Sequence, residues 1–77
     1  MEEKIQKIMA NLFDVSIEEI TDESSPSNIK KWDSLNHIKL VVELEEEFNV
    51  KFSNLEVLDM QTYKLVLLAI KNSEKIL

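Results

Sequence analysis

The 77-residue chain contains no glycine, no cysteine and a single proline. Glycine serves where a backbone turns sharply or approaches a ligand closely. Its absence therefore excludes phosphate-cradling loops, dinucleotide fingerprints, nucleophile elbows and calcium-binding EF-hand loops. The tight turns of β-hairpins also favour residues with positive φ, chiefly glycine. These exclusions leave a helical domain as the expected fold class.

Without cysteine, the chain has no disulfide framework, no thiolate nucleophile and no ordinary Cys/His zinc site, and His37 is its only histidine. Hydrophobic residues make up 44% of the chain and charged residues 31%, a balance typical of a globular domain. The length fits one small domain. We therefore expect residues 1–77 to fold as a single unit.

Acidic residues dominate the charge: fifteen Asp and Glu against nine basic residues give a formal net charge of −6. Such a chain repels phosphate backbones and anionic lipids, so we expect basic protein surfaces as partners, not nucleic acid or membrane. The longest apolar run, residues 65–70, is too short to span a bilayer. The first residues lack the layout of a signal peptide, so we expect a cytoplasmic protein.

Hydrophobic periodicity predicts four helices. The first covers residues 2–13 and the second runs from about Asp33 to Asn49. A short third helix over residues 53–59 opens with a Ser-x-x-Glu capping box, and a fourth begins at Thr62 and frays towards Leu77. The expected fold is all-α, a small four-helix bundle of three longer helices and one short helix.

A connection of about twenty residues joins the first two helices, and a compact domain rarely keeps so long a loop without a functional reason. Ser16 and Glu19 form a capping box that predicts one helical turn within it. Residues 21–28 are polar, contain the only proline and predict an exposed loop. The apolar residues of the connection are expected to hold it against the core: Val15, Ile17, Ile20 and Ile29.

The second helix has two apolar stripes instead of one. When the residues are placed at about 100° per residue around the helix, the apolar side chains fall into two groups on different faces. The first consists of Leu40, Val41, Leu44 and Phe48, and the second of Leu35, Ile38 and Val42. Either the second stripe contacts a partner, or the helix is central and packs against neighbours on both sides.

The sequence Trp-Asp-Ser-Leu at residues 32–35, followed by Leu-Glu-Glu-Glu-Phe at residues 44–48, resembles the acyl carrier proteins. The resemblance covers essentially the whole chain, including the helix order and the long first loop. It implies that Ser34 carries a 4′-phosphopantetheine arm through a phosphodiester and that acyl groups travel on the arm as thioesters. A helix N-terminus suits a phosphate, because its N–H groups and macrodipole favour negative charge.

The resemblance also implies roles around this serine. Asp33 would support attachment by contacting the phosphopantetheinyl transferase or its metal ion, while its alternative role is helix capping. Plain capping is likewise the alternative for Ser34. The chain would itself catalyse no reaction. Its expected partners are the transferase and acyl-handling enzymes with basic docking surfaces, and it is expected to be a monomer.

The second stripe corresponds to positions at which acyl carrier proteins contact partner enzymes. Acidic residues on the same helix would supply contacts to basic partner surfaces, or they form an ordinary solvated face. The residues concerned are Leu35, Ile38, Val42, Glu43, Glu46 and Glu47.

The chain departs from carriers of fatty acid synthesis, which usually have glycine where Lys31 stands and acidic residues where Asn36 and Lys39 stand. The form Trp-Asp-Ser-Leu is similar to stand-alone carriers of lipid, polysaccharide or secondary-metabolite pathways. Trp32 alternatively anchors the loop over the core. His37 either lines the mouth of a cargo cavity or is simply half-exposed.

The sequence is also compatible with two other functions. The first is an unmodified acidic docking module, a degenerate carrier that binds a partner without a prosthetic group. The second is a hydrolase that uses Ser34 and His37, which are neighbours at i and i+3 on a helix. The lack of glycine for a strained nucleophile turn and the small size of the domain argue against the hydrolase.

Overall fold

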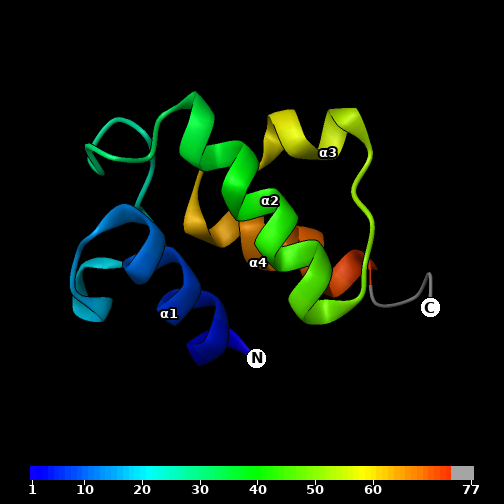
Figure 1. The fold of residues 1–77 in the computed structure, drawn as a ribbon, viewed down its shortest axis with the longest axis horizontal. Coiled ribbons are helices and arrows are strands. Elements are labelled where there is room, and N and C mark those ends of the chain that lie inside the picture. Colours follow the sequence, from blue (N-terminus) through cyan, green and yellow to red (C-terminus); the bar gives the residue numbers. More distant parts are fainter. Residues whose placement is uncertain (74–77) are drawn as a thin grey trace.

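The computed structural model describes residues 1–73, in which four α-helices and one 3-10 turn form a small bundle without strands (Figure 1). In chain order the elements are α1 (Glu2–Phe13), η1 (Ile17–Glu19), α2 (Ser34–Phe48), α3 (Asn54–Asp59) and α4 (Tyr63–Ser73). The predicted all-α fold and the order of the helices are confirmed. The predicted fraying of the last helix towards Leu77 falls outside the described residues.

Two helices end in the left-handed conformation that glycine usually supplies. Asp14 follows α1 with φ 58°, and Asn49 follows α2 with φ 54°. Asp and Asn are the residues that tolerate this region best after glycine. Their backbone N–H groups donate to the carbonyl oxygens of Ala10 and Glu45, so the last turns are closed without glycine.

The helices α1, α2 and α4 share one hydrophobic core. In Figure 1, α2 runs diagonally across the molecule with α1 on one side and α4 behind it. The side chains of Leu40 and Leu44 on α2 are fully buried, as the first apolar stripe predicts. The other helices contribute Ile5, Met9, Ala10, Phe13, Tyr63, Val66, Leu67 and Ile70 to the same cluster.

The long connection between α1 and α2 is held against this core, as predicted. Ile20 and Ile29 are buried, and Val15 and Ile17 pack against the cluster. Trp32, at the end of the connection, is 2% exposed and stacks on Phe13 of α1, with the ring centroids 5.1 Å apart. The interpretation of Trp32 as a loop anchor is confirmed. The connection therefore delivers the chain to the start of α2 in a fixed position.

Two predictions within the connection hold only in part. One helical turn forms at residues 17–19, as predicted, but it is a 3-10 turn and the Ser16 side chain makes no capping hydrogen bond. The loop at residues 21–28 is largely exposed, but Ser24 is buried, with an exposed fraction of 3%. The Ser24 hydroxyl accepts from the Thr21 N–H at 2.8 Å and donates to the Glu19 carbonyl at 3.0 Å. These local bonds stabilise an inward turn that its polar composition does not predict.

The start of each later helix is capped as the sequence predicts. The Asp33 side chain caps α2, and Thr62 accepts from the Leu65 N–H at 3.1 Å in the first turn of α4. Ser53 and Glu56 form both bonds of the capping box of α3, at 3.2 and 2.7 Å. Helix α3 nevertheless contains no buried residue. Its formation is specified locally, while its attachment to the bundle depends on other contacts.

Candidate functional site

Ser34 is the first residue of α2 and is exposed. The residue before it, Asp33, is the cap: its Oδ1 accepts from the Asn36 N–H at 2.9 Å. The alternative that Ser34 itself caps the helix is therefore wrong, and its hydroxyl is not used in capping. The Asn36 side-chain amide also donates to the Lys31 carbonyl at 2.7 Å, which ties the loop to the helix start. Asn36, a departure from the usual family pattern, thus holds this junction.

Apart from the Asp33 carboxylate, which is engaged in capping, the electrostatics around Ser34 suit an anion. The N–H groups of Ser34 and Leu35 lie in the first turn of α2, where no helical carbonyl is available to them. The first turn contains no acidic residue, and the positive end of the helix dipole lies here. Two exposed lysines, Lys30 and Lys31, precede it, and Lys31 pairs with Asp14 at 3.3 Å. An exposed hydroxyl in this setting fits attachment through a phosphodiester.

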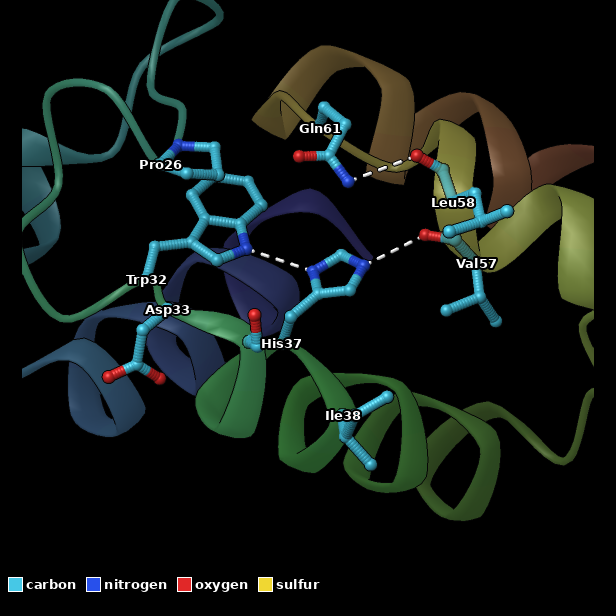
Figure 2. A pocket seen from close by; sticks show the side chains of 9 residues that line it. Pro26, Trp32, Asp33, His37, Ile38, Val57, Leu58 and Gln61 are labelled. Atoms are coloured by element: carbon cyan, nitrogen blue, oxygen red, sulfur yellow. Dashed lines mark hydrogen bonds between the residues drawn. The ribbon is translucent and has the colours of Figure 1, made fainter.

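A pocket of about 470 Å³ opens beside Ser34, between α2, α3 and the long connection (Figure 2). Its walls are mainly apolar, with an imidazole and an amide among them. The lining residues are Pro26, Trp32, Asp33, Ser34, His37, Ile38, Val57, Leu58 and Gln61. We call this space the α2–α3 pocket.

His37 crosses the middle of the α2–α3 pocket, and both of its ring nitrogens form hydrogen bonds (Figure 2). Trp32 Nε1–H donates to His37 Nδ1 at 2.9 Å, so Nδ1 is an acceptor. The proton of the neutral ring then lies on Nε2, which donates to the Val57 carbonyl at 2.8 Å. His37 is half-buried and lines the pocket, so the two roles considered for it coexist. With both nitrogens engaged, His37 does not serve Ser34 as a base, which removes the main support for the hydrolase.

The second apolar stripe of α2 faces solvent. Leu35 is 65% exposed, Ile38 54% and Val42 47%. We refer to these three residues as the exposed stripe. Two leucines of α3 are also highly exposed, Leu55 and Leu58. Their exposure was not predicted from the sequence, although leucines three residues apart in a short helix signal a shared apolar face.

The acidic residues of α2 divide into two groups. Glu43 and Glu46 are exposed on the helix surface. Glu47 pairs with Lys4 of α1 at 2.9 Å, and Glu45 Oε2 accepts from the Phe52 N–H at 2.9 Å. Glu45 and Glu47 therefore fasten α2 to neighbouring segments. At about 100° per residue, Glu45 falls between the two apolar stripes of α2, and this position is a sequence signal for a role at the edge of the core.

Among residues 1–73, no group of three or more His, Asp or Glu side chains is arranged to hold a metal ion. No helix of the same residues is long and apolar enough to cross a membrane.

Comparisons with known proteins agree with this geometry. A family described as "Phosphopantetheine attachment site" matches residues 3–69. The chain is 28% identical over 75 residues to the acyl carrier protein of Buchnera aphidicola subsp. Schizaphis graminum, covering 97% of this chain and 95% of that protein. It is 34% identical over 70 residues to the acyl carrier protein of Thermosynechococcus vestitus, covering 91% of this chain and 86% of that protein.

The fold is also similar to a solved structure, the solution NMR structure of the holo acyl carrier protein from Geobacter metallireducens. The TM-score is 0.85 at 25% sequence identity, with 97% of this chain and 86% of that one covered. The resemblance noted in the sequence and the expected phosphopantetheine cofactor are thereby confirmed. The chain belongs to the acyl carrier proteins, the family that bears a phosphopantetheine attachment site.

Proposed function

We propose that residues 1–77 act as one carrier domain in which Ser34 is the attachment residue for 4′-phosphopantetheine. The observation that carries the proposal is the exposed Ser34 hydroxyl at the first position of α2, within the region that matches the attachment-site family. The attached arm supplies a terminal thiol that holds acyl groups as thioesters. The chain in this proposal carries acyl groups between enzymes and catalyses none of their reactions.

The residues beside Ser34 have separate tasks in this proposal. Buried Trp32 and the hydrogen bond from the Asn36 amide to the Lys31 carbonyl hold the serine at the surface, where a transferase reaches it. Asp33 caps the helix through Oδ1, which leaves Oδ2 outside the capping bond. We infer that this second oxygen contacts the transferase or its metal ion. Capping and attachment then draw on different atoms of one carboxylate.

We also propose that the exposed stripe and two acidic residues form the docking surface for partner enzymes. Leu35, Ile38 and Val42 present apolar side chains on α2 beside Ser34, with Glu43 and Glu46 also exposed on this helix. Apolar contact supplies affinity, while the carboxylates favour partners with basic surfaces.

The pathway is inferred from the departures around Ser34. Asn36 and Lys39 replace the acidic residues that carriers of fatty acid synthesis usually have, which makes this face less acidic. Charge at a docking surface selects partners chiefly through encounter rate. We therefore favour a specialised pathway of lipid, polysaccharide or secondary-metabolite assembly over general fatty acid synthesis.

Intact-mass measurement tests the attachment. The chain is first shown to be unmodified, then incubated with coenzyme A, magnesium and a broad-specificity phosphopantetheinyl transferase. We expect a gain of one phosphopantetheine, no gain for Ser34→Ala, and an unchanged gain for Ser53→Ala, which removes the exposed serine at the start of α3. Loading of Ser34→Ala would refute the site.

A different outcome would support the unmodified docking module. If the wild-type chain gains no mass while a control carrier is loaded under the same conditions, the chain is not a substrate for the transferase. The exposed stripe would then serve a partner that binds without a prosthetic group.

A further inference from the structure

Helix α3 forms the outer wall of the α2–α3 pocket and is held by few contacts. None of its residues is buried, and Leu55 and Leu58 are 74% and 67% exposed. The segment is anchored at its two ends, by half-buried Phe52 before the helix and by Met60, 1% exposed, after it. Between these anchors, one side-chain hydrogen bond joins α3 to α2 among residues 1–73. It runs from His37 Nε2 to the Val57 carbonyl.

His37 is itself held in position from the core side. Its ring stacks beside Trp32, with centroids 6.2 Å apart and an interplanar angle of 22°. Trp32 in turn stacks on Phe13 of α1. A continuous chain of contacts therefore runs from α1 through Trp32 and His37 to Val57 of α3. We call the two hydrogen bonds of this chain, Trp32 to His37 and His37 to Val57, the His37 bridge.

The pocket does not continue into the core below it. Leu40 and Met60 are 0% and 1% exposed, and Trp32 fills the side towards α1. A group that enters deeper must displace α3, because the interior is already packed. Displacing α3 breaks the bond between His37 and Val57, which leaves a donor and an acceptor without partners in a partly buried site. The bridge therefore opposes deeper entry.

We propose that His37 is a specificity-determining residue that limits the length of acyl chain this carrier shelters between α2 and α3, an inference that rests on the proposed attachment at Ser34. Short groups lie in the α2–α3 pocket against Trp32, Ile38 and Leu58 while the bridge is intact. Each methylene that enters the pocket is removed from water and adds stability. Once the pocket is full, further methylenes stay in solvent and add none.

The experiment uses the phosphopantetheine-loaded protein carrying straight-chain acyl groups from acetyl to dodecanoyl. The midpoint of thermal unfolding is measured for each, together with the fluorescence of Trp32, the only tryptophan of the chain. For the wild type we expect the midpoint to rise by several degrees over the short groups and then stay level. The Trp32 emission should change over the same chain lengths.

Two substitutions distinguish the effect of the His37 hydrogen bonds from the effect of the size of the His37 side chain. His37→Phe keeps a ring but removes both hydrogen bonds, and we expect the rise to continue to longer chains. His37→Gln retains an acceptor and a donor, and we expect the wild-type profile. If His37→Phe does not fold, Trp32→Phe replaces it: an aromatic ring remains beside Phe13 while the donor to His37 is lost. This variant has no tryptophan, so the unfolding midpoint is its readout.

The outcomes distinguish this inference from the proposed function. A wild-type midpoint that rises continuously to dodecanoyl, or the same profile in wild type and His37→Phe, would overturn the role of His37 and leave attachment at Ser34 intact. A chain that accepts no arm would overturn both. A profile that levels off in the wild type and His37→Gln but extends in His37→Phe supports the inference.

Discussion

Helix α3 is stabilised in a different way from the core formed by α1, α2 and α4. The three core helices bury Ile5, Leu44 and Val66 completely, whereas α3 buries no side chain and has the only complete capping box among the described helices. A capping box favours a helical turn, but short helices are marginal without tertiary packing. The comparison shows that local signals specify a helix, while burial decides how firmly it is attached.

The candidate site lies between the buried core and the exposed helix α3. Ser34 belongs to the first turn of α2, which the buried side chain of Trp32 and the Asp33 cap hold in place. The opposite wall of the pocket belongs to α3 through Val57 and Leu58. In the proposed function, the arm is attached at a fixed point beside a wall that contains no buried residue.

The largest expected effect comes from a cavity in the core. Leu44→Ala removes a fully buried side chain and should lower the free energy of unfolding by about 2–5 kcal/mol. Leu58→Ala on α3, where the side chain is 67% exposed, should change it by less than about 0.5 kcal/mol. Urea unfolding followed by circular dichroism measures both. Similar losses for the two variants would contradict the division into core and wall.

Substitution of Asp33 should cause a smaller loss of stability and separates its capping role from its proposed role in attachment. Asp33→Ala removes the cap of α2 and should cost about 0.5–2 kcal/mol, while Asp33→Asn keeps a capping oxygen and should cost little. If the carboxylate supports attachment, Asp33→Asn loads more slowly at nearly wild-type stability. Loading rates by mass spectrometry and unfolding curves together decide this. Wild-type loading of Asp33→Asn would restrict Asp33 to capping.

Tyr63, at the start of α4, makes the stability of the folded protein sensitive to high pH. Burial, with smaller contributions from the charges of Glu2 and Asp22, raises the pKa of its phenol above the ordinary value of 10.0. The folded state therefore holds this proton more tightly than the unfolded state. Its contribution is fully present below about pH 10 and is lost as the pH rises towards the folded-state pKa.

Tyr63→Phe tests this dependence, because phenylalanine keeps the ring and cannot ionise. We expect stability to fall less steeply above about pH 10 in the variant than in the wild type. Urea midpoints measured across this range provide the comparison, and their slopes matter more than their absolute values. Parallel slopes would show that Tyr63 ionises alike in both states.

The smallest effect is expected from the ion pair between Lys4 and Glu47, which links α1 to α2. The two side chains are 60% and 40% exposed, so solvent screens their attraction. Glu47→Gln should cost no more than about 1 kcal/mol, and the difference should shrink in high salt. A larger, salt-independent loss in urea unfolding would mean that this pair contributes to the core itself.

Much of the fold was predictable because its signals are local. Apolar periodicity located α1 and both stripes of α2, and the residues Asp33, Ser53 and Thr62 marked the starts of three helices. The Ser16 box failed because the same residue pattern also suits a 3-10 turn closed by the Ser16 backbone carbonyl. Local patterns therefore indicate where turns occur better than which bonds close them.

The pocket was less predictable because its key contacts join residues that are distant in sequence. His37 and Val57 are twenty residues apart, and Glu45 reaches the backbone of Phe52 across the turn after α2. Nothing in the pattern around His37 specifies which carbonyl its ring contacts. The sequence indicated Ser34 through the family resemblance, whereas the wall facing it became visible only in three dimensions.

Amide hydrogen exchange tests the division between core and wall most directly. We expect the α3 amides, such as Val57, to exchange through local opening far faster than the core amides of α2 around Leu44. His37→Phe should speed exchange in α3 further and leave the core amides unchanged. Equal protection of α3 and the core, or a loss of protection throughout the molecule in His37→Phe, would contradict the account.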